Sequence, residues 1–195
     1  DNIEYPITEN KLHLGPPHNS NECYSYAKRM IDVLSRAYNK EYNCKYVSII
    51  FGNLYGPYDN FTPNMSHVIP DLIQECYHST NTFIVKGSGM ALRQFTYVPD
   101  ICPILYWVIF EYNDTNEPII IANDEEVHIY TIASYIAKVF SFQGNIKYDL
   151  TKPDGQYRKT LSNEKVRKLY PYDLNFTSLE DGIFHTVKWY LSQSK

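Results

Sequence analysis

The stretch Tyr24-Ser25-Tyr26-Ala27-Lys28 decides how the rest of the chain is interpreted. It places a tyrosine and a lysine four residues apart at the start of a predicted helix, so the two side chains lie on one helical face, one turn apart. A free tyrosine has a pKa of about 10, and a nearby ammonium group favours the phenolate. The pair therefore predicts proton transfer to or from an oxygen that becomes, or ceases to be, a carbonyl.

By itself this spacing is a weak signal, because the chain has 19 tyrosines and a tyrosine in the core beside a lysine in solvent is the ordinary alternative. Two further runs make it specific: NLYGPYDNF at 53–61 and SHVIP at 66–70. Together with the region 15–32, they resemble the GDP-L-fucose synthase family of the extended short-chain dehydrogenase/reductases. The resemblance extends from about Tyr5 to near Trp189.

The hydrophobic patterns predict alternating helices and strands. Helices are expected over residues 20–42, 67–78, 99–112, 131–140, 163–169 and 178–191. Strands are expected over 45–51, which is predicted to be buried and parallel, and over 82–85, 93–98, 118–122 and 146–148; residues 52–65 are expected to form a long loop. This alternation is typical of an α/β chain with a parallel sheet.

The resemblance refines the fold class to the C-terminal portion of an NAD(P)-binding Rossmann fold plus a smaller α/β substrate-binding domain. It implies that residues 1–60 complete the Rossmann domain, and that 61–195 form mainly the nucleotide-sugar domain. Residues 90–112 are expected to return to the Rossmann sheet. The sequence holds no Gly-x-Gly-x-x-Gly turn between a strand and a helix, so we expect the chain to be the C-terminal portion of a longer protein.

Composition excludes several function classes. The net charge of −4 argues against a nucleic-acid surface, which needs clustered positive charge. No apolar run approaches the length of a membrane span, and the first residues lack the features of a signal peptide. The four cysteines form no Cys-x-x-Cys motif and are expected to be free thiols, so we predict a cytoplasmic protein without a metal site.

The resemblance also implies roles for individual residues. Tyr24 would be the general acid that protonates O4 of the sugar, and Lys28 would bind the nicotinamide ribose of NADPH and tune Tyr24. His67 would protonate carbon during epimerisation at C3 and C5, a role that suits a side chain titrating near neutrality. Asn53, Leu54 and His67 would also contact the cofactor.

Two further residues match positions that bind the nucleotide sugar. Arg93 matches an arginine on the diphosphate, for which paired guanidinium donors are suited. Asp154 matches a substrate-binding aspartate, although a simple Pro-Asp-Gly turn is the alternative that local chemistry favours. Glu75 stands where the family has a cation, and Lys86 stands where it has a tryptophan; one hypothesis is that Lys86 supplies the missing cation.

The segment Phe51-Gly52 also departs from the family, which has Pro-Thr before Asn-Leu, and this weakens the expected cofactor contact. The cysteine base and the catalytic Ser/Thr of the family have no counterpart in this chain. The resemblance implies NADPH-dependent conversion of GDP-4-keto-6-deoxy-D-mannose to GDP-L-fucose by a homodimer. The alternatives are another nucleotide-sugar epimerase or dehydratase, and a truncated non-catalytic module that binds a nucleotide sugar or a partner.

Overall fold

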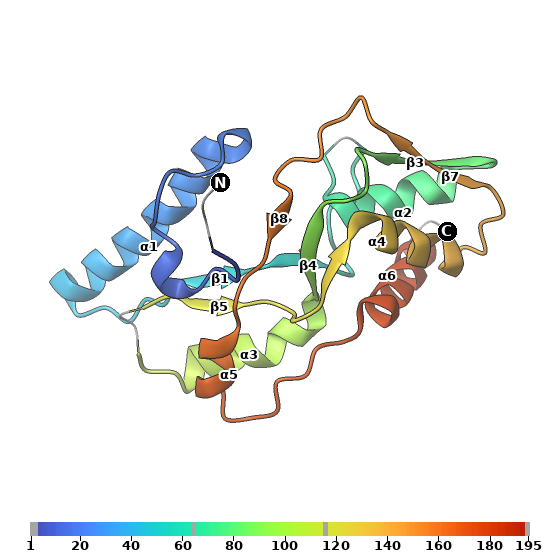
Figure 1. Cartoon of the computed structure of the whole chain (residues 1–195). Coiled ribbons are helices and arrows are strands. Elements are labelled where there is room, and N and C mark those ends of the chain that lie inside the picture. The colour runs from blue at the N-terminus through green and yellow to red at the C-terminus, as the bar shows by residue number, and fades with distance from the viewer. Residues whose placement is uncertain (1–3, 64, 115–116, 194–195) are drawn as a thin grey trace.

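The computed structural model describes residues 4–63, 65–114 and 117–193, and it confirms the α/β class (Figure 1). Two short 3-10 helices, η1 (Glu9–Lys11) and η2 (Asn19–Asn21), precede α1 (Glu22–Tyr42). Short strands and helices then alternate: β1 (Ile49–Phe51), β2 (Asn53–Tyr55), α2 (Val68–His78), β3 (Thr82–Lys86), β4 (Leu92–Tyr97), α3 (Val98–Phe110), β5 (Ile119–Ile121), β6 (Glu126–His128), α4 (Ile129–Val139), β7 (Asn145–Asp149), β8 (Arg158–Lys159), α5 (Glu164–Leu169) and α6 (Leu179–Gln193).

The strands form three small sheets in which most neighbours are parallel. β1 pairs with β5, and β3 pairs with β7, both in parallel. In the third sheet β4 is central: β2 and β8 pair with it in parallel, whereas β6 is antiparallel. Because helices such as α2 and α3 connect successive strands, parallel pairing is the expected result.

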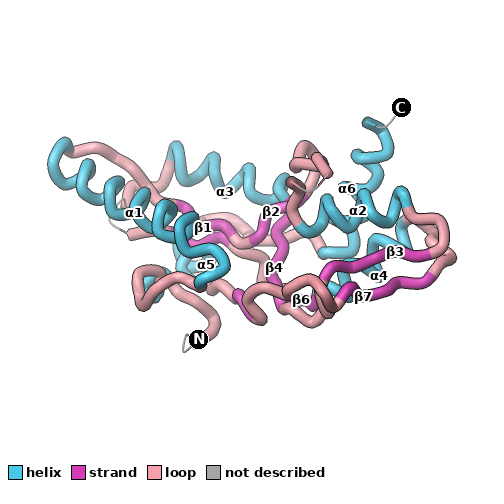
Figure 2. Tube along the Cα trace, turned by 90° about the horizontal axis from the view of Figure 1, so that it is seen from above, coloured by secondary structure: helices cyan, strands magenta, loops and turns pink. Residues whose placement is uncertain are grey.

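Two main hydrophobic clusters lie at opposite ends of the molecule, with β4 between them (Figures 1 and 2). One cluster joins α2, β3, α4 and α6. The other joins α3 with β1, β5 and α5. The domain division at residue 60 remains a prediction, and the packing adds that β5 and α5, which follow this boundary, pack with the elements of the first region.

Several predicted elements need correction. The strand predicted over 45–51 is shorter, and β1 is half-buried, because α3 and α5 cover one face and only the thin segment around Ile7 and Leu12 packs on the other. The predicted loop 52–65 contains β2, whose partner β4 is about 40 residues away and invisible to local patterns. β6 and β8 were not predicted, because strands of two or three residues carry too little periodicity.

α1 differs from the other long helices in what it buries. Among its described side chains only Asp32 is buried, and large apolar side chains such as Met30, Ile31 and Leu34 are about half exposed. Polar contacts attach the helix instead: the Asp32 carboxylate lies 2.8 Å from Nε2 of His13, and the Arg29 guanidinium donates to the Gly15 carbonyl at 2.7 Å. Within the helix, Asp32 also accepts hydrogen bonds from Arg36. No helix in the described part of the chain is long and apolar enough to cross a membrane.

Candidate functional site

Tyr24 and Lys28 lie together on the exposed face of α1, as the spacing predicts. The Nζ atom of Lys28 is 5.5 Å from the centre of the Tyr24 ring, and Tyr24 is 59% exposed. α1 begins at Glu22, so both residues lie in its first two turns. This arrangement presents a phenol and an ammonium group to whatever binds over the start of the helix.

His67 occupies the N-cap position of α2, but its side chain does not cap the helix. Its imidazole is 77% exposed, and Nδ1 lies 3.1 Å from Oδ1 of Asp59. Among the described residues, no hydrogen bond, ion pair or ring contact joins His67 to Tyr24 or Lys28. The structure therefore places the two predicted catalytic groups on separate helices, each with a local partner.

Asn53 and Leu54 lie in β2, at the carboxyl end of β1. The Asn53 amide donates a hydrogen bond of 2.8 Å to the Gln94 carbonyl of β4, and Leu54 packs in the cluster around α3. Both side chains thus hold the strand end in place. A role of either residue in contacting a cofactor remains a prediction.

A small cavity of about 40 Å³ lies beside this strand end. Its lining residues are Phe51, Gly52, Asn53, Lys159 and Leu161. Lys159 was not singled out by the sequence, because no local motif marks it and only the pairing of β8 with β4 brings it here. The Lys159 ammonium group makes no hydrogen bond or ion pair within residues 4–63, 65–114 and 117–193. Desolvation, and secondarily the charge of Arg93, lower the pKa of its ammonium group.

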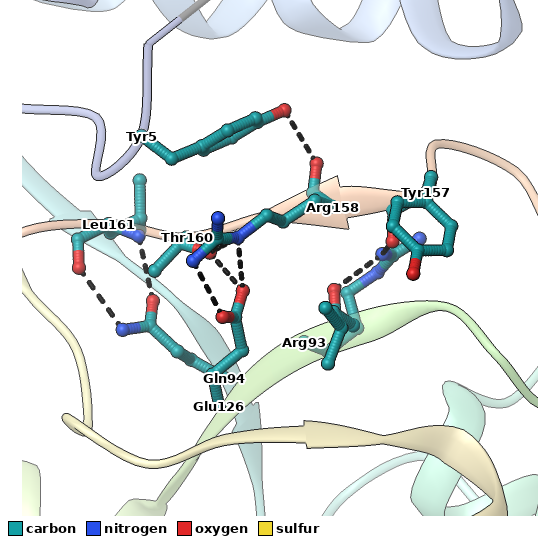
Figure 3. Close-up of polar contacts among 9 residues, drawn as sticks. Tyr5, Arg93, Gln94, Glu126, Tyr157, Arg158, Thr160 and Leu161 are labelled. Carbon is teal, nitrogen blue, oxygen red and sulfur yellow. Dashed lines mark hydrogen bonds and ion pairs between the residues drawn. The ribbon is translucent and has the colours of Figure 1, made fainter.

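Arg93 lies directly opposite Lys159 in the register of β4 and β8. Its guanidinium donates hydrogen bonds to the backbone carbonyls of Leu92 and Gln156. It also donates one to the carbonyl of Tyr157, which lies beside it in Figure 3. Burial lowers its pKa, which the neighbouring Asp154 opposes. Arg93 and Lys159 together place two positive charges at one position of the sheet. Some of the N–H groups of Arg93 are already hydrogen-bonded to the backbone carbonyls of residues 156 and 157.

Further polar contacts fix β8 beside β4 (Figure 3). The Gln94 side chain exchanges two hydrogen bonds with the backbone of Leu161, and Glu126 forms an ion pair of 2.8 Å with Arg158. Partial burial opposes ionisation of Glu126, but hydrogen bonds from Arg158 and Thr160 lower its pKa below the ordinary value. These contacts hold Lys159 at the cavity.

Asp154 fixes the turn between β3 and β4. Its carboxylate accepts hydrogen bonds from the Ser88 hydroxyl at 2.7 Å and from the Ser88 backbone N–H at 2.6 Å, which lower its pKa. Gly87 has φ +80°, and a Cβ atom there would lie 2.4 Å from the Asp154 carboxylate, so glycine is required. The geometry supports a structural role for Asp154, and its substrate contact remains a prediction.

Lys86 forms an ion pair with Asp71 at the start of α2, with its Nζ atom 2.9 Å from the carboxylate. Asp71 precedes Glu75 by four residues, so the cation at position 86 lies next to an acidic face of α2. The hypothesis that Lys86 serves the substrate in place of the cation missing at position 75 remains a prediction. Among the described residues, no group of three or more His, Cys, Asp or Glu side chains forms a metal site.

Comparison with known proteins adds sequence relatives to this geometry. Residues 2–122 match the family described as "NAD dependent epimerase/dehydratase family". The chain is 45% identical over 203 aligned residues to "Probable GDP-L-fucose synthase" of Drosophila melanogaster and 42% identical over 195 to "GDP-L-fucose synthase" of Dictyostelium discoideum. Each alignment covers 98% of this chain, and it covers 63% and 61% of the two relatives.

A solved structure is similar over the same extent. The crystal structure of a GDP-L-fucose synthetase from Naegleria fowleri bound to NADP is 44% identical in sequence, and it superposes with a TM-score of 0.92. The match covers 100% of this chain and 63% of that chain. The chain therefore spans about 60% of the length of the relatives that it matches.

Proposed function

The chain belongs to the NAD dependent epimerase/dehydratase family, and on that premise we propose that it contributes the proton-transfer residues and the sugar-binding part of a GDP-L-fucose synthase. The reaction is the NADPH-dependent conversion of GDP-4-keto-6-deoxy-D-mannose to GDP-L-fucose, by epimerisation at C3 and C5 and reduction at C4. One observation carries the proposal: the paired Tyr24 hydroxyl and Lys28 ammonium on an exposed helical face.

The side chains suit reduction of a ketone. Bound NADPH supplies the hydride that reaches C4. Tyr24 gives its phenolic proton to O4, so its O–H bond breaks as the new O4–H bond forms. Lys28, one turn further along α1, stabilises the tyrosinate that remains.

The residues present also fit a dinucleotide. An exposed ammonium group beside an exposed phenol offers donors for ribose hydroxyl groups, and we assign Lys28 to the ribose next to the nicotinamide. The side chains of Asn53 and Leu54 are engaged within the fold, so they support this contact by holding the end of β1 and β2. His67, at the start of α2, is the remaining residue that we assign to the cofactor.

The cations at the β4–β8 junction suit the anionic part of the substrate. Arg93 and Lys159 face each other in the strand register, and we propose that they attract the diphosphate of the nucleotide sugar. Asp154 holds the neighbouring turn in place through its hydrogen bond with Ser88, and in this way it supports the sugar contact without binding the sugar itself.

We also propose that the protein acts in the cytoplasm as a homodimer. The support for the dimer is the apolar face that α1 leaves exposed, together with a surface hollow lined by Ile31, Leu34, Ser35, Tyr38 and Tyr46. A group of exposed apolar side chains around a hollow is typical of an interaction site. Light scattering on wild-type protein and on a Leu34→Glu variant tests this, and a wild-type protein that is monomeric at high concentration would refute it.

The test of the activity compares Tyr24→Phe with Tyr26→Phe in the natural protein. Tyr26 lies in the same turn and is also exposed, but Met30 occupies the position four residues later. We expect Tyr24→Phe to lower kcat for NADPH oxidation by about 10²- to 10⁴-fold, the usual contribution of a general acid, and Tyr26→Phe to change little. Equal activity in both variants would refute the proposed role of Tyr24.

Epimerisation is followed separately, by incorporation of solvent deuterium at C3 and C5 of the sugar. Tyr24→Phe should retain this exchange, whereas His67→Gln should lose it. A 4-epimerase or a dehydratase would not exchange at both carbons, so the absence of exchange in wild-type protein would favour the alternative enzymes. Binding of GDP-sugar without any turnover would favour a non-catalytic module.

A further inference from the structure

Asp59 makes a contact that the sequence motifs do not explain. Its Oδ1 atom lies 3.1 Å from Nδ1 of His67, and its side chain is only 13% exposed although it belongs to a surface loop. The other carboxylate oxygen, Oδ2, is buried and has no hydrogen-bond partner among the described residues. In that part of the chain, His67 is the one ion-pair partner of Asp59.

The position of His67 makes this contact informative. A residue at an N-cap commonly turns its side chain to the free N–H groups of the first helical turn. His67 does not, and its imidazole points to Asp59 instead. Because the contact uses Nδ1, the opposite ring nitrogen, Nε2, is directed away from the carboxylate.

Aromatic contacts attach the loop around Asp59 to α6. Tyr58 precedes the aspartate and Phe61 lies two residues after it, and their ring centres lie 5.1 and 5.7 Å from that of Trp189. Phe61 also stacks on Tyr190, at 4.8 Å. Within the loop, the Asn60 N–H donates to Asp59 Oδ1 at 2.7 Å, which orients the carboxylate.

We propose that Asp59 is a positioning residue that fixes the tautomer and orientation of His67. The Nδ1–H bond is held by the carboxylate, so only Nε2 exchanges a proton with a bound molecule. This inference rests on the proposed role of His67 in epimerisation. In that step the Nε2–H bond breaks, the proton joins the carbanionic carbon of the sugar, and the imidazolium becomes a neutral imidazole that keeps its Nδ1–H.

The test measures the tautomer directly by nuclear magnetic resonance of protein labelled with ¹⁵N at histidine. Spectra are recorded about two pH units above the ordinary histidine pKa of about 6.5, where a free imidazole is neutral. The His67 signal is identified by its loss in His67→Gln. We expect a pyrrole-type signal from Nδ1 and a pyridine-type signal from Nε2.

Two variants of Asp59 should change the ratio of the two neutral His67 tautomers by different amounts. In Asp59→Ala the ratio of the Nδ1–H to the Nε2–H form should fall about tenfold, as expected for loss of a charge-assisted hydrogen bond. Asp59→Asn keeps a carbonyl oxygen that accepts from Nδ1–H, so it should restore part of the ratio. A merely structural role would not produce this graded recovery.

The matched control is Asp71→Asn. Asp71 is another carboxylate near the start of α2, but its side chain pairs with Lys86 and makes no hydrogen bond to the His67 imidazole. Its one contact with His67 is a backbone hydrogen bond, which Asp71→Asn keeps, so the His67 tautomer should not change. Two other histidines report on folding: His13 contacts Asp32 through Nε2, and His128 contacts the Met90 carbonyl through Nδ1, and both should keep their tautomers in every variant.

A His67 that is mainly Nε2–H in wild-type protein, or a ratio unchanged in Asp59→Ala, would overturn the role of Asp59. Neither result depends on turnover, so each would leave the proposed activity standing. Conversely, equal activity of Tyr24→Phe and Tyr26→Phe would refute the proposed role of Tyr24. The tautomer of His67 could still be measured, and it would still decide whether Asp59 positions His67.

Discussion

α1 and α2 carry the proposed acid residues, yet they are attached to the molecule in opposite ways. α2 buries five side chains in the core, among them Ile69, Leu72 and Ile73. α1 is nearly twice as long and buries only Asp32 among its described side chains. The helix with His67 is therefore fixed by apolar burial, whereas the helix with Tyr24 and Lys28 is fixed by charged contacts.

This difference in attachment predicts that the two helices differ in local stability. Burial of apolar area stabilises a helix in proportion to the area removed from water, without strict geometry. A contact such as that of Asp32 in α1 with His13 outside it is directional and depends on the ionisation of its members. We therefore expect α1 to open locally under conditions that leave α2 in place.

The largest effect should come from truncation in α2. Ile73 is fully buried, so Ile73→Ala should lower the free energy of unfolding by about 3 kcal/mol, through lost burial and the cavity left behind. Leu34→Ala in α1 removes a side chain that is 50% exposed, and should cost less than about 1 kcal/mol. Urea unfolding followed by circular dichroism measures both.

Similar losses in the two variants would contradict the comparison, because Leu34 would then have to be buried in solution. Repeating Leu34→Ala over a range of protein concentrations identifies one cause: a loss that grows with concentration shows that a second copy covers this face. The Ile73→Ala loss should not depend on concentration.

A smaller and local effect is expected at Asp32. Asp32→Asn removes the carboxylate that contacts His13 outside α1 and Arg36 within it, and loss of the His13 contact should weaken the attachment of α1 by about 2 kcal/mol. Amide hydrogen exchange should then become faster in α1 and stay unchanged in α2. Equal acceleration in both helices would show that they unfold together.

The same contact should respond to acid. Burial opposes ionisation of Asp32, but His13, Ser48 and Arg36 together lower its pKa below the ordinary 3.8. A carboxylate whose pKa is lower in the folded state stabilises it fully above that ordinary value, and the contribution is lost as the pH falls through the folded value. Exchange in α1, corrected for its intrinsic rate, should therefore accelerate below about pH 4 in wild-type protein, and much less in Asp32→Asn.

The sequence predicted the helices well because each carries its own periodicity. α2, α4 and α6 begin within two residues of the expected positions. The Ser178 hydroxyl accepts a hydrogen bond from the Asp181 N–H and donates one to the Asp181 carboxylate at the start of α6. The pair Tyr24 and Lys28 was likewise readable, since four-residue spacing on a helix fixes proximity.

What the sequence did not reveal depends on contacts between distant segments. Lys159 reaches the cavity beside Asn53 only because β8 pairs with β4. The local sequence of neither strand predicts this pairing. Asp59 lay inside a recognised motif, but its partner His67 was identified only from the loop conformation. The helical pattern of α1 predicted an apolar face, and it could not show that the described residues leave this face uncovered.

The smallest expected effect concerns the Tyr24–Lys28 pair itself. The Tyr24 hydroxyl makes no hydrogen bond among the described residues, and the ring and the ammonium lie on an exposed face. Tyr24→Phe and Lys28→Met should therefore change the free energy of unfolding by less than about 0.5 kcal/mol, the scale of an exposed cation–π contact. Thermal unfolding with Tyr26→Phe as the control measures this. If Tyr24→Phe lowered the free energy of unfolding by more than about 1 kcal/mol, the hydroxyl would have a structural role. Reduced activity of that variant would then no longer be evidence for proton transfer by Tyr24.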